Sequence, residues 1–343
     1  MPFNKNKTLI ILSTIIAALL AIFLVTTFIR SKATSWPVSF GSYVLSPDTQ
    51  FCVVQLAGDN APIGIVNASG TGPLKLLNGT EGGSEPAWNS ESNGIYYTVV
   101  DAPNSVDSLP MIKFYRLNQT GLPYILIQSK TTGITTPTPS PDGRYLAYVA
   151  VSASGPSLMH IHNLVTNNDL TINNFPVTNS KSLLWNAGSH SISFIGNDMS
   201  GHKKNLIVCS EAAKFAPQPT GIECEYYSFS PQSDKISFLG PRNDRGEFIT
   251  LIVQGLPPRS IATFDRPQIA PHTQWSNDGK SLFFIDHLRS NPEICQLDIA
   301  SGKISILIPR GTSKRLAIVG VDKNQLIYSK SYNSGSGLSR VSI

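Results

Sequence analysis

Residues 275–284 have the sequence Trp-Ser-Asn-Asp-Gly-Lys-Ser-Leu-Phe-Phe, and this phrase decides the fold. An aromatic residue is followed by a polar turn that ends in Asp278 and Gly279, after which a strand begins. Asp can hydrogen-bond its own backbone in such a turn, and Gly adopts a positive φ without strain. Side chains of a strand alternate with a period of two, so we expect Leu282 and Phe284 to face the same way.

The phrase recurs along the chain at intervals of 43 to 51 residues. With its first residue as position 0, it starts at Leu45, Trp88, Pro139, Trp185, Phe229, Trp275 and Val319. Position +7 is apolar throughout, as Cys52, Ile95, Leu146, Ile192, Ile236, Leu282 and Leu326. Position +9 is aromatic in six phrases, as Tyr97, Tyr148, Phe194, Phe238, Phe284 and Tyr328. Unrelated strands would not keep this register, so we interpret these residues, and the aromatics at position 0, as packing residues.

Further strands follow each phrase, for example residues 293–298 and, after a turn, residues 304–308. Four short strands in about 45 residues, repeated, are typical of a β-propeller blade. One blade cannot bury both of its faces, whereas a closed ring of blades can. The sequence therefore predicts an all-β propeller, with seven blades of four antiparallel strands. Six blades remain an alternative, because the phrases at Leu45 and Val319 are the most degenerate.

The last repeat ends after its third strand, which leaves its blade one strand short. Residues 36–40 precede the first phrase and have no blade of their own. We expect these residues to add the missing outer strand and so to close the ring. The alternative is that they form a plain linker.

The phrase resembles the repeat of the TolB-like family of propellers, which are built from WD40-like repeats. The resemblance is carried by Ser140-Pro141-Asp142-Gly143, by residues 275–284 and by residues 293–298, and it covers roughly residues 36–343. The phrases at Trp185, Phe229 and Val319 keep the apolar positions but lose much of the turn. The resemblance implies a cell-envelope protein that binds other proteins.

Residues 8–29 form an uncharged run rich in Ile, Leu, Ala, Val and Phe. A signal-peptide core has about 7–15 residues, whereas a membrane span needs about 20. We therefore predict a transmembrane helix or signal anchor at 8–29, between a short cytoplasmic N-terminus at 1–7 and a linker at 30–35. A cleaved signal is the alternative, because residues 31–33 resemble a cleavage site. The propeller, residues 36–343, would lie in the periplasm or outside the cell.

Charged residues make up 14% of the chain, and the formal net charge is +5. Residues 1–32 hold four basic residues and no acid, so the remainder has 23 basic and 22 acidic residues. This balance predicts no nucleic-acid partner. The sequence has no G-x-S-x-G motif, P-loop or G-x-G-x-x-G motif. We accordingly predict no catalytic, cofactor-binding or metal-binding residues.

Two groups of residues could nevertheless carry chemistry. His160 and His162 would point to one face of a strand and could be a metal pair, but no carboxylate or thiol lies at ligand spacing from them, so two surface histidines are the favoured interpretation. Cys209 and Cys224 flank the passage between two repeats and are candidates for a disulfide in an oxidising compartment. Cys52 and Cys295 occupy strand positions that predict buried thiols.

Three functions are consistent with these patterns. The first is a membrane-anchored, non-enzymatic scaffold that binds protein partners at a propeller face or at the channel mouth. The second is an enzyme of the lyase or glycosidase type with its site in the channel. The third is a receptor for a glycan or another small ligand in the same channel. We rank the first highest and expect no cofactor, because the packing of the repeats accounts for all seven phrases.

Overall fold

The computed structural model describes residues 40–343 except 59, 101–108, 119–121, 130–132, 153, 198–203, 225, 233–234, 243–247, 254–255, 258, 263–272, 287–291, 310, 312–314 and 333–334. The predicted membrane segment at 8–29 and the linker at 30–35 therefore lie outside the described residues. Within the described ranges, no helix is long and apolar enough to cross a membrane.

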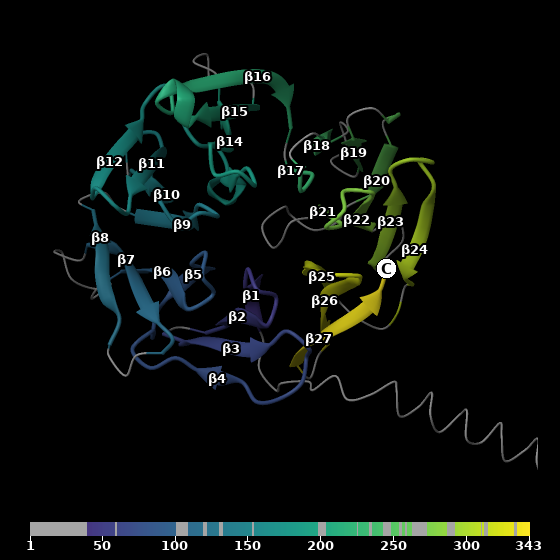
Figure 1. Ribbon diagram of the computed structural model, residues 1–343, viewed down its shortest axis with the longest axis horizontal. Helices are drawn as coiled ribbons and strands as arrows, with labels where there is room; N and C mark the ends of the chain where they lie inside the picture. The colour runs from purple at the N-terminus through teal and green to yellow at the C-terminus, as the bar shows by residue number, and fades with distance from the viewer. Residues whose placement is uncertain are drawn as a thin grey trace, which may run out of the picture.

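Seven antiparallel sheets form a ring around a central axis (Figure 1). Blades 1 to 3 comprise β1 (Phe40–Leu45), β2 (Phe51–Leu56), β3 (Ile63–Asn67), β4 (Lys75–Leu76); β5 (Ser84–Trp88), β6 (Gly94–Val100), β7 (Pro110–Arg116), β8 (Tyr124–Gln128); and β9 (Gly133–Pro139), β10 (Tyr145–Val151), β11 (Leu158–Asn163), β12 (Asn168–Ile172). Blades 4 and 5 comprise β13 (Leu184–Trp185), β14 (Ser191–Asn197), β15 (Lys204–Ser210), β16 (Pro217–Glu223); and β17 (Tyr226–Phe229), β18 (Ile236–Arg242), β19 (Phe248–Val253), β20 (Arg259–Ala262). Blades 6 and 7 comprise β21 (Thr273–Trp275), β22 (Ser281–Asp286), β23 (Glu293–Asp298), β24 (Ile304–Ile308); and β25 (Arg315–Asp322), β26 (Gln325–Tyr332), β27 (Gly335–Ser342). Two short 3-10 helices, η1 (Ser180–Ser182) and η2 (Glu211–Ala213), belong to blade 4.

The fold is thus the predicted propeller with seven blades, six of which have four described strands. In blades 1 to 6 the residue at position 0 ends the first strand and pairs with the residue at position +7, as Trp275 does with Leu282. In blade 7 the turn between the first two strands is two residues shorter, and Leu326 pairs with Val321 instead of Val319. The repeat assignment at Val319 is therefore displaced by two residues.

The turn owes its shape to a serine and an aspartate. Ser276 Oγ donates to Asp278 Oδ1 at 2.7 Å and accepts from the Ser281 N–H at 2.9 Å. The Asp278 carboxylate also accepts from the Lys280 N–H at 3.0 Å, and Gly279 has a φ of +68°. Blades 1 and 3 repeat this arrangement, so the Asp of the phrase is engaged in folding the turn.

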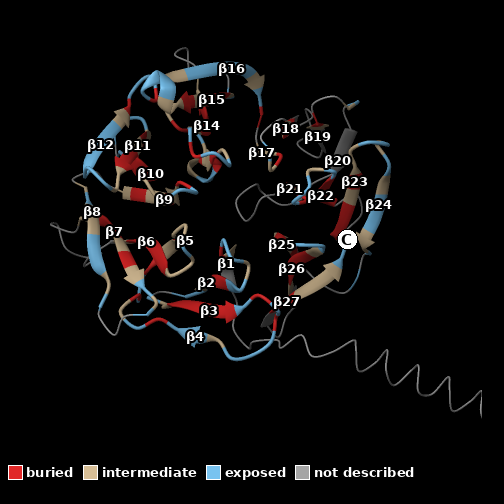
Figure 2. Ribbon diagram, in the orientation of Figure 1, coloured by how far each residue is buried: buried red, intermediate tan, exposed pale blue. Residues whose placement is uncertain are grey.

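The hydrophobic core is divided into seven clusters, and each cluster lies between two neighbouring blades. Figure 2 shows the buried residues concentrated on the middle strands of the blades. The side chains at positions +7 and +9 of each blade face the preceding blade. Leu282 and Phe284, for example, lie in the cluster shared with blade 5, and Ile95 and Tyr97 in the cluster shared with blade 1.

The residues interpreted as packing residues all lie in or against these clusters: Trp88, Trp185, Phe229, Trp275, Tyr97, Tyr148, Phe194, Phe238, Phe284 and Tyr328. Two of the tryptophans also tie neighbouring blades by hydrogen bonds. The indole Nε1 of Trp88 donates to the Val44 carbonyl, and that of Trp185 to the Thr138 carbonyl, each at 2.9 Å.

Blade 7 meets blade 1 without a described fourth strand, because β25, β26 and β27 form a sheet of three. Phe40, the end of the segment predicted to close the ring, belongs to β1 of blade 1, and residues 36–39 lie outside the described residues. In the described part of the chain, the two blades meet through an apolar cluster and a polar clasp. In the clasp, Arg340 binds Asp322 at 2.9 Å and the Ala68 carbonyl at 3.0 Å, and Thr49 Oγ1 donates to Asp322 at 2.9 Å.

Candidate functional site

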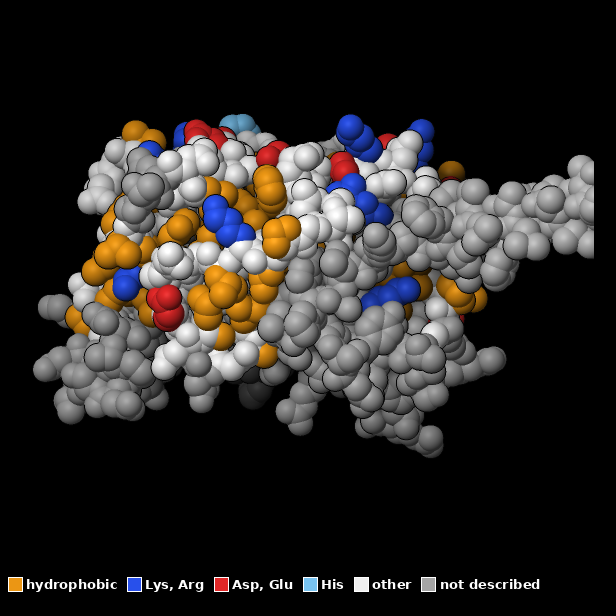
Figure 3. Space-filling model, turned by 90° about the horizontal axis from the view of Figure 1, so that it is seen from below, with side chains coloured by type: hydrophobic (Ala, Val, Ile, Leu, Met, Phe, Trp, Pro, Cys, Tyr) orange, Lys and Arg blue, Asp and Glu red, His pale blue; other side chains and the backbone are white. Residues whose placement is uncertain are grey.

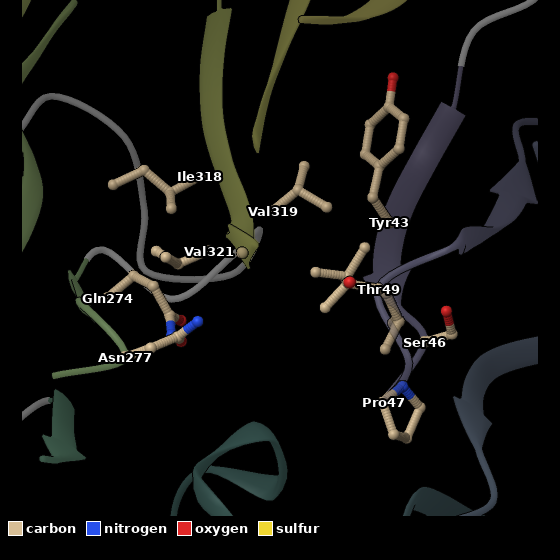
Figure 4. Close-up of a pocket in the computed structure, with 12 residues that line it drawn as sticks. Tyr43, Ser46, Pro47, Thr49, Gln274, Asn277, Ile318, Val319 and Val321 are labelled. Atoms are coloured by element: carbon tan, nitrogen blue, oxygen red, sulfur yellow. The ribbon is translucent and has the colours of Figure 1, made fainter. Parts of the chain in front are cut away.

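A pocket of about 490 Å³ opens at the centre of the ring, where blades 1, 6 and 7 meet. Its walls come from the first strands of these blades and the turns that follow them (Figure 4). The lining residues are Tyr43, Val44, Leu45, Ser46, Pro47, Thr49, Gln274, Asn277, Ile318, Val319, Gly320 and Val321.

A β-bulge shapes the wall that blade 7 contributes. Ile318 pairs with Tyr328 and Gly320 pairs with Ile327, so Val319 is the extra residue of β25. A bulge breaks the alternation of side chains along a strand. Consecutive residues of β25 can therefore border the same hollow. Gly320 allows close contact at this wall, because a Cβ there would lie 2.6 Å from Leu45 Cδ2.

Among the described residues that line the pocket there is no carboxylate, imidazole, thiol or amine. Tyr43 contributes a phenol ring, and Gln274 and Asn277 contribute amides that can both donate and accept hydrogen bonds. Ile318, Val319 and Val321 supply the apolar part. The described part of this wall can hold an uncharged ligand by hydrogen bonds and apolar contact.

Carboxylates are sparse on the first strands of all seven blades. Among their described residues, Glu85 and Asp322 are the only carboxylates, and Asp322 belongs to the clasp. Glu85 accepts hydrogen bonds from the backbone N–H and the hydroxyl of Thr136 in the next blade. Both residues have positive φ, +50° and +56°, and both precede a proline. Such a backbone costs on the order of 1–3 kcal/mol per residue, so this pair is a strained inter-blade tie.

A second group of polar side chains lies between blades 5 and 6. Asp286, Glu293 and Cys295 are buried, and their potential ligand atoms lie within 4.8 Å of one another. Asp286 pairs with Glu293 across β22 and β23, and Cys295 lies two residues further on the same face. Among the described residues, this is the group of three whose possible metal ligands lie close enough together to hold an ion. Each of the three residues also takes part in another interaction.

The histidine pair is not wholly a surface feature. His162 is only 7% exposed, and the pairing of β11 with β12 places Asp169 directly opposite it. His160 Nδ1 lies 2.7 Å from Asp169 Oδ2. The sequence did not reveal this carboxylate, because its position depends on the register of the hairpin. His202, His272 and His287 lie outside the described residues.

The predicted disulfide between Cys209 and Cys224 is not formed. Cys209 pairs with Pro217 near the connection between β15 and β16, whereas Cys224 follows the far end of β16. Four or five residues of strand at about 3.3 Å each separate the two positions, far more than the 7 Å that a disulfide spans. Cys209 packs between blades 3 and 4, and Cys224 packs between blades 4 and 5. Burial raises the pKa of the Cys209 thiol to about 12.

No family model matches the chain, and no curated protein matches it in sequence. Many solved structures match its fold. The β-propeller domain of the Trilobed protease from Pyrococcus furiosus has a TM-score of 0.59 at 13% identity, over 89% of this chain and 95% of that one. Acylaminoacyl peptidase from Pyrococcus horikoshii has 0.60 at 13%, over 89% and 52%. Oligogalacturonate lyase from Vibrio parahaemolyticus has 0.59 at 10%, over 76% and 78%.

TolB from Acinetobacter baumannii also aligns, with a TM-score of 0.49 at 14% identity, over 78% of this chain and 63% of that one. At these identities, and with this TM-score, the likeness extends to the propeller architecture and no further. The chain is therefore a β-propeller, as the sequence predicted. Membership of the TolB-like family is not established.

The prediction that the protein is not an enzyme has to be corrected. Structures that share its fold include a protease, prolyl endopeptidases, a dipeptidyl peptidase and an acylaminoacyl peptidase. The architecture occurs in enzymes, so packing that accounts for every repeat is no argument against an activity. This chain spans about half the length of the acylaminoacyl peptidase that it matches.

Proposed function

We propose that this propeller binds a protein partner at the pocket between blades 1, 6 and 7. The observation that carries the proposal is the chemistry of the described lining residues, which combine an aromatic ring, two amides and an apolar strand and include no charged side chain. An extended, uncharged segment of a polypeptide presents backbone donors and acceptors together with small apolar side chains. Amides and hydroxyls at the channel mouth match the former, and the half-buried Val319 matches the latter.

The position of the pocket supports the same function. A propeller presents its turns at the rims of the ring, and binding residues are commonly found on such turns. Here the turns of blades 1 and 6 contribute Pro47, Thr49 and Asn277 to the wall. A partner at this position would touch three blades at once.

The proposal is tested by site-specific photo-crosslinking in intact cells that express the full chain. A photoreactive residue at Gln274 or Asn277 is expected to give a reproducible protein adduct. The matched control replaces Val165, which is 77% exposed on a turn of blade 3 away from the pocket. Recovery of the same adducts at all three positions, or of none at the pocket, would refute the proposal.

A substitution that adds a charge at the pocket tests the same proposal in a second way. Asn277 is exposed at the pocket mouth, so a partner seated there would cover the ammonium group of Asn277→Lys. No described lining residue offers a counter-charge, and a charge that is covered without one is costly. We expect the yield of the pocket adduct formed from position 274 to fall by about tenfold or more, which corresponds to about 1.4 kcal/mol of binding free energy. Val165→Lys serves as the control and should leave the yield unchanged.

We further propose that residues 8–29 tether the propeller to a membrane, with the ring outside the cytoplasm. The uncharged run supports this tether, since its length matches that of a membrane span. The full-length protein should stay with membranes during alkaline carbonate extraction, and external protease should degrade the propeller after the outer barrier is opened. Release into the carbonate supernatant would refute the tether without bearing on the pocket.

A further inference from the structure

A patch of exposed apolar side chains lies on the outer circumference of blades 1 and 2. Eight large apolar residues are exposed in the described part of the chain, and four of them belong to this patch, which we call the apolar flank. The four, each between 49% and 81% exposed, are Leu76 of β4, Leu122 just before β8, and Tyr124 and Ile125 of β8. Figure 3, which looks at the ring from below Figure 1, shows apolar side chains gathered over the flank of the ring with few charged ones among them.

The two strands of the apolar flank belong to neighbouring blades, and their ends touch. A Cβ at Gly79, three residues after Leu76, would lie 3.1 Å from Pro123 Cδ and 3.2 Å from Leu122 Cδ2. β4 and β8 are the outermost strands of their sheets, so each offers a free edge away from the channel. Residues 122–127 are six apolar residues in succession. Exposed apolar edges of this kind favour association with another surface, so we expect the apolar flank to be covered.

The neighbouring side chains indicate the chemistry of the cover. Lys75 precedes Leu76 and Arg116 ends β7, and both residues are exposed. The exposed acid Glu81 accepts a hydrogen bond from the Gly79 N–H at 3.3 Å. Basic side chains pair with lipid phosphates while their stems cover apolar surface, and tyrosine is enriched at the boundary between a bilayer and water. This combination matches the headgroup layer of an anionic membrane.

The position of the chain's N-terminal segment supports a membrane as the cover, and the inference rests on the tether proposed above for residues 8–29. Ten residues, 30–39, separate that segment from Phe40, where β1 begins, so they can span at most about 35 Å. β1 is the first strand of the sheet that β4 ends. Three strand spacings of about 4.8 Å, or roughly 14 Å, separate the two strands. The outer edge of blade 1 is therefore within reach of the bilayer that holds the tether.

We propose that the apolar flank rests on the surface of the bilayer that holds residues 8–29. β4 and β8 would lie against the headgroups, and the ring would stand on its edge. The channel pocket lies at the centre of the ring, where blades 1, 6 and 7 meet. A ring that contacts the membrane through its circumference leaves this pocket open to a partner, so both kinds of binding can occur together.

The experiment uses the full-length protein in nanodiscs of phosphatidylcholine and phosphatidylglycerol. All four native cysteines are buried, so a thiol-reactive fluorophore labels the one that Ile125→Cys introduces. Ile306→Cys is the matched control, because Ile306 is 59% exposed on β24, an outer strand across the ring from β8 in Figure 1. Nitroxide-labelled lipid quenches only at short range. It should quench the label at position 125 at least about threefold more than the label at position 306.

A second substitution tests the contact in the same labelled chain. Leu122→Asp removes apolar surface and adds a charge of the sign that the lipids carry, so we expect quenching at position 125 to fall by about half or more. Val165→Asp, on a turn of blade 3, should leave the quenching unchanged. Circular dichroism shows whether each variant is folded.

The proposal is overturned if the labels at positions 125 and 306 are quenched equally, or if Leu122→Asp leaves the quenching at 125 intact. Quenching at neither position also overturns it, in favour of a protein cover on the apolar flank. Failure of the chain to enter nanodiscs would instead refute the tether, and this inference with it. Each of these results leaves the pocket proposal to its own crosslinking test.

Discussion

Glu211 joins blades 3 and 4 by accepting hydrogen bonds from three side chains. Tyr145 donates at 2.8 Å, Arg144 donates from two nitrogens at 3.1 and 3.2 Å, and His190 Nδ1 lies at 3.2 Å. These hydrogen bonds, from Tyr145 first and then from Arg144 and His190, lower the pKa of Glu211 from 4.5 to about 2. Asp142 lies beside Arg144, in the turn between β9 and β10. Burial acts to raise the pKa of the Asp142 carboxyl, but hydrogen bonds from Ser140 and Arg144 outweigh it and lower that pKa to about 2.

A pH dependence of stability follows from these shifts. The folded carboxylates bind protons more weakly than the unfolded ones, so the stability they contribute is complete above about pH 4.5 and is lost as the pH falls toward 2. Urea unfolding at pH 6, 4 and 3 should show a falling midpoint in the wild-type protein. Glu211→Gln should be less stable at pH 6 and should lose less between pH 6 and 3. If the urea midpoint of Glu211→Gln fell as much between pH 6 and pH 3 as that of the wild-type protein, Glu211 would not be the cause of the pH dependence.

The three buried tryptophans at position 0 differ in their hydrogen bonds. Nε1 of Trp88 and of Trp185 binds a carbonyl of the preceding blade, whereas Nε1 of Trp275 has no partner among the described residues. Replacement by Phe removes similar apolar surface at all three positions, but it breaks a hydrogen bond at only two. We expect Trp88→Phe and Trp185→Phe to cost about 1 kcal/mol more than Trp275→Phe, as measured by chemical denaturation. Equal costs would contradict this reading of the indole contacts.

At the scale of the element, the turns after the first strands of blades 1 to 4 and 6 have a residue with positive φ at position +4. Blades 3 and 6 use Gly143 and Gly279, with φ of +73° and +68°. A Cβ at Gly143 would lie 2.7 Å from Ser90 Oγ of the preceding blade. Gly143→Ala should therefore destabilise the protein by roughly 1–2 kcal/mol. Gly311→Ala is the control for the thermal unfolding measurement, because Gly311 has open space around it.

The elements were predictable to the extent that they depend on local sequence. Position 0 of the repeat marks the last residue of the first strand in six blades, and the pairing of Trp275 with Leu282 follows from the turn length. In blade 7 the turn is shorter, so the sequence predicted Val319 as the partner of Leu326, whereas the actual partner is Val321. The position of Asp169 beside His160 depends on a hairpin register that no repeat specifies.

The candidate pocket was less predictable than the blades. It combines residues from three blades, separated by more than two hundred positions in the chain, and a bulge at Val319 that leaves no mark in the repeat. The sequence could indicate that a channel mouth exists, but not which side chains meet there. The disulfide prediction failed for a related reason. Spacing along the chain placed Cys209 and Cys224 close, whereas the hairpin puts them at opposite ends.

For the whole molecule, the contact between blades 7 and 1 decides whether the ring is closed. Arg340 and Asp322 are largely buried, with side chains 23% and 16% exposed, and Arg340 also binds the Ala68 carbonyl. Arg340→Met leaves Asp322 without its counter-charge, so we expect a loss of roughly 2–3 kcal/mol and faster hydrogen exchange in β1, β2 and β27. Lys280→Met removes an exposed ion pair and should change stability by less than about 0.5 kcal/mol. Exchange that accelerates equally in all blades would contradict a seam-specific role.

The same seam has a consequence during synthesis. Every sheet is built from consecutive strands, so each blade can form soon after its last residue leaves the ribosome. The contact of Thr49 with Asp322 spans 273 residues, and no earlier segment can replace it. Until blade 7 emerges, Cys52, Val54 and Val66 of blade 1 lack their partners Ile327 and Leu338. The nascent chain thus carries an uncovered apolar face from the synthesis of blade 1 until that of blade 7, and we expect a chaperone to bind this face.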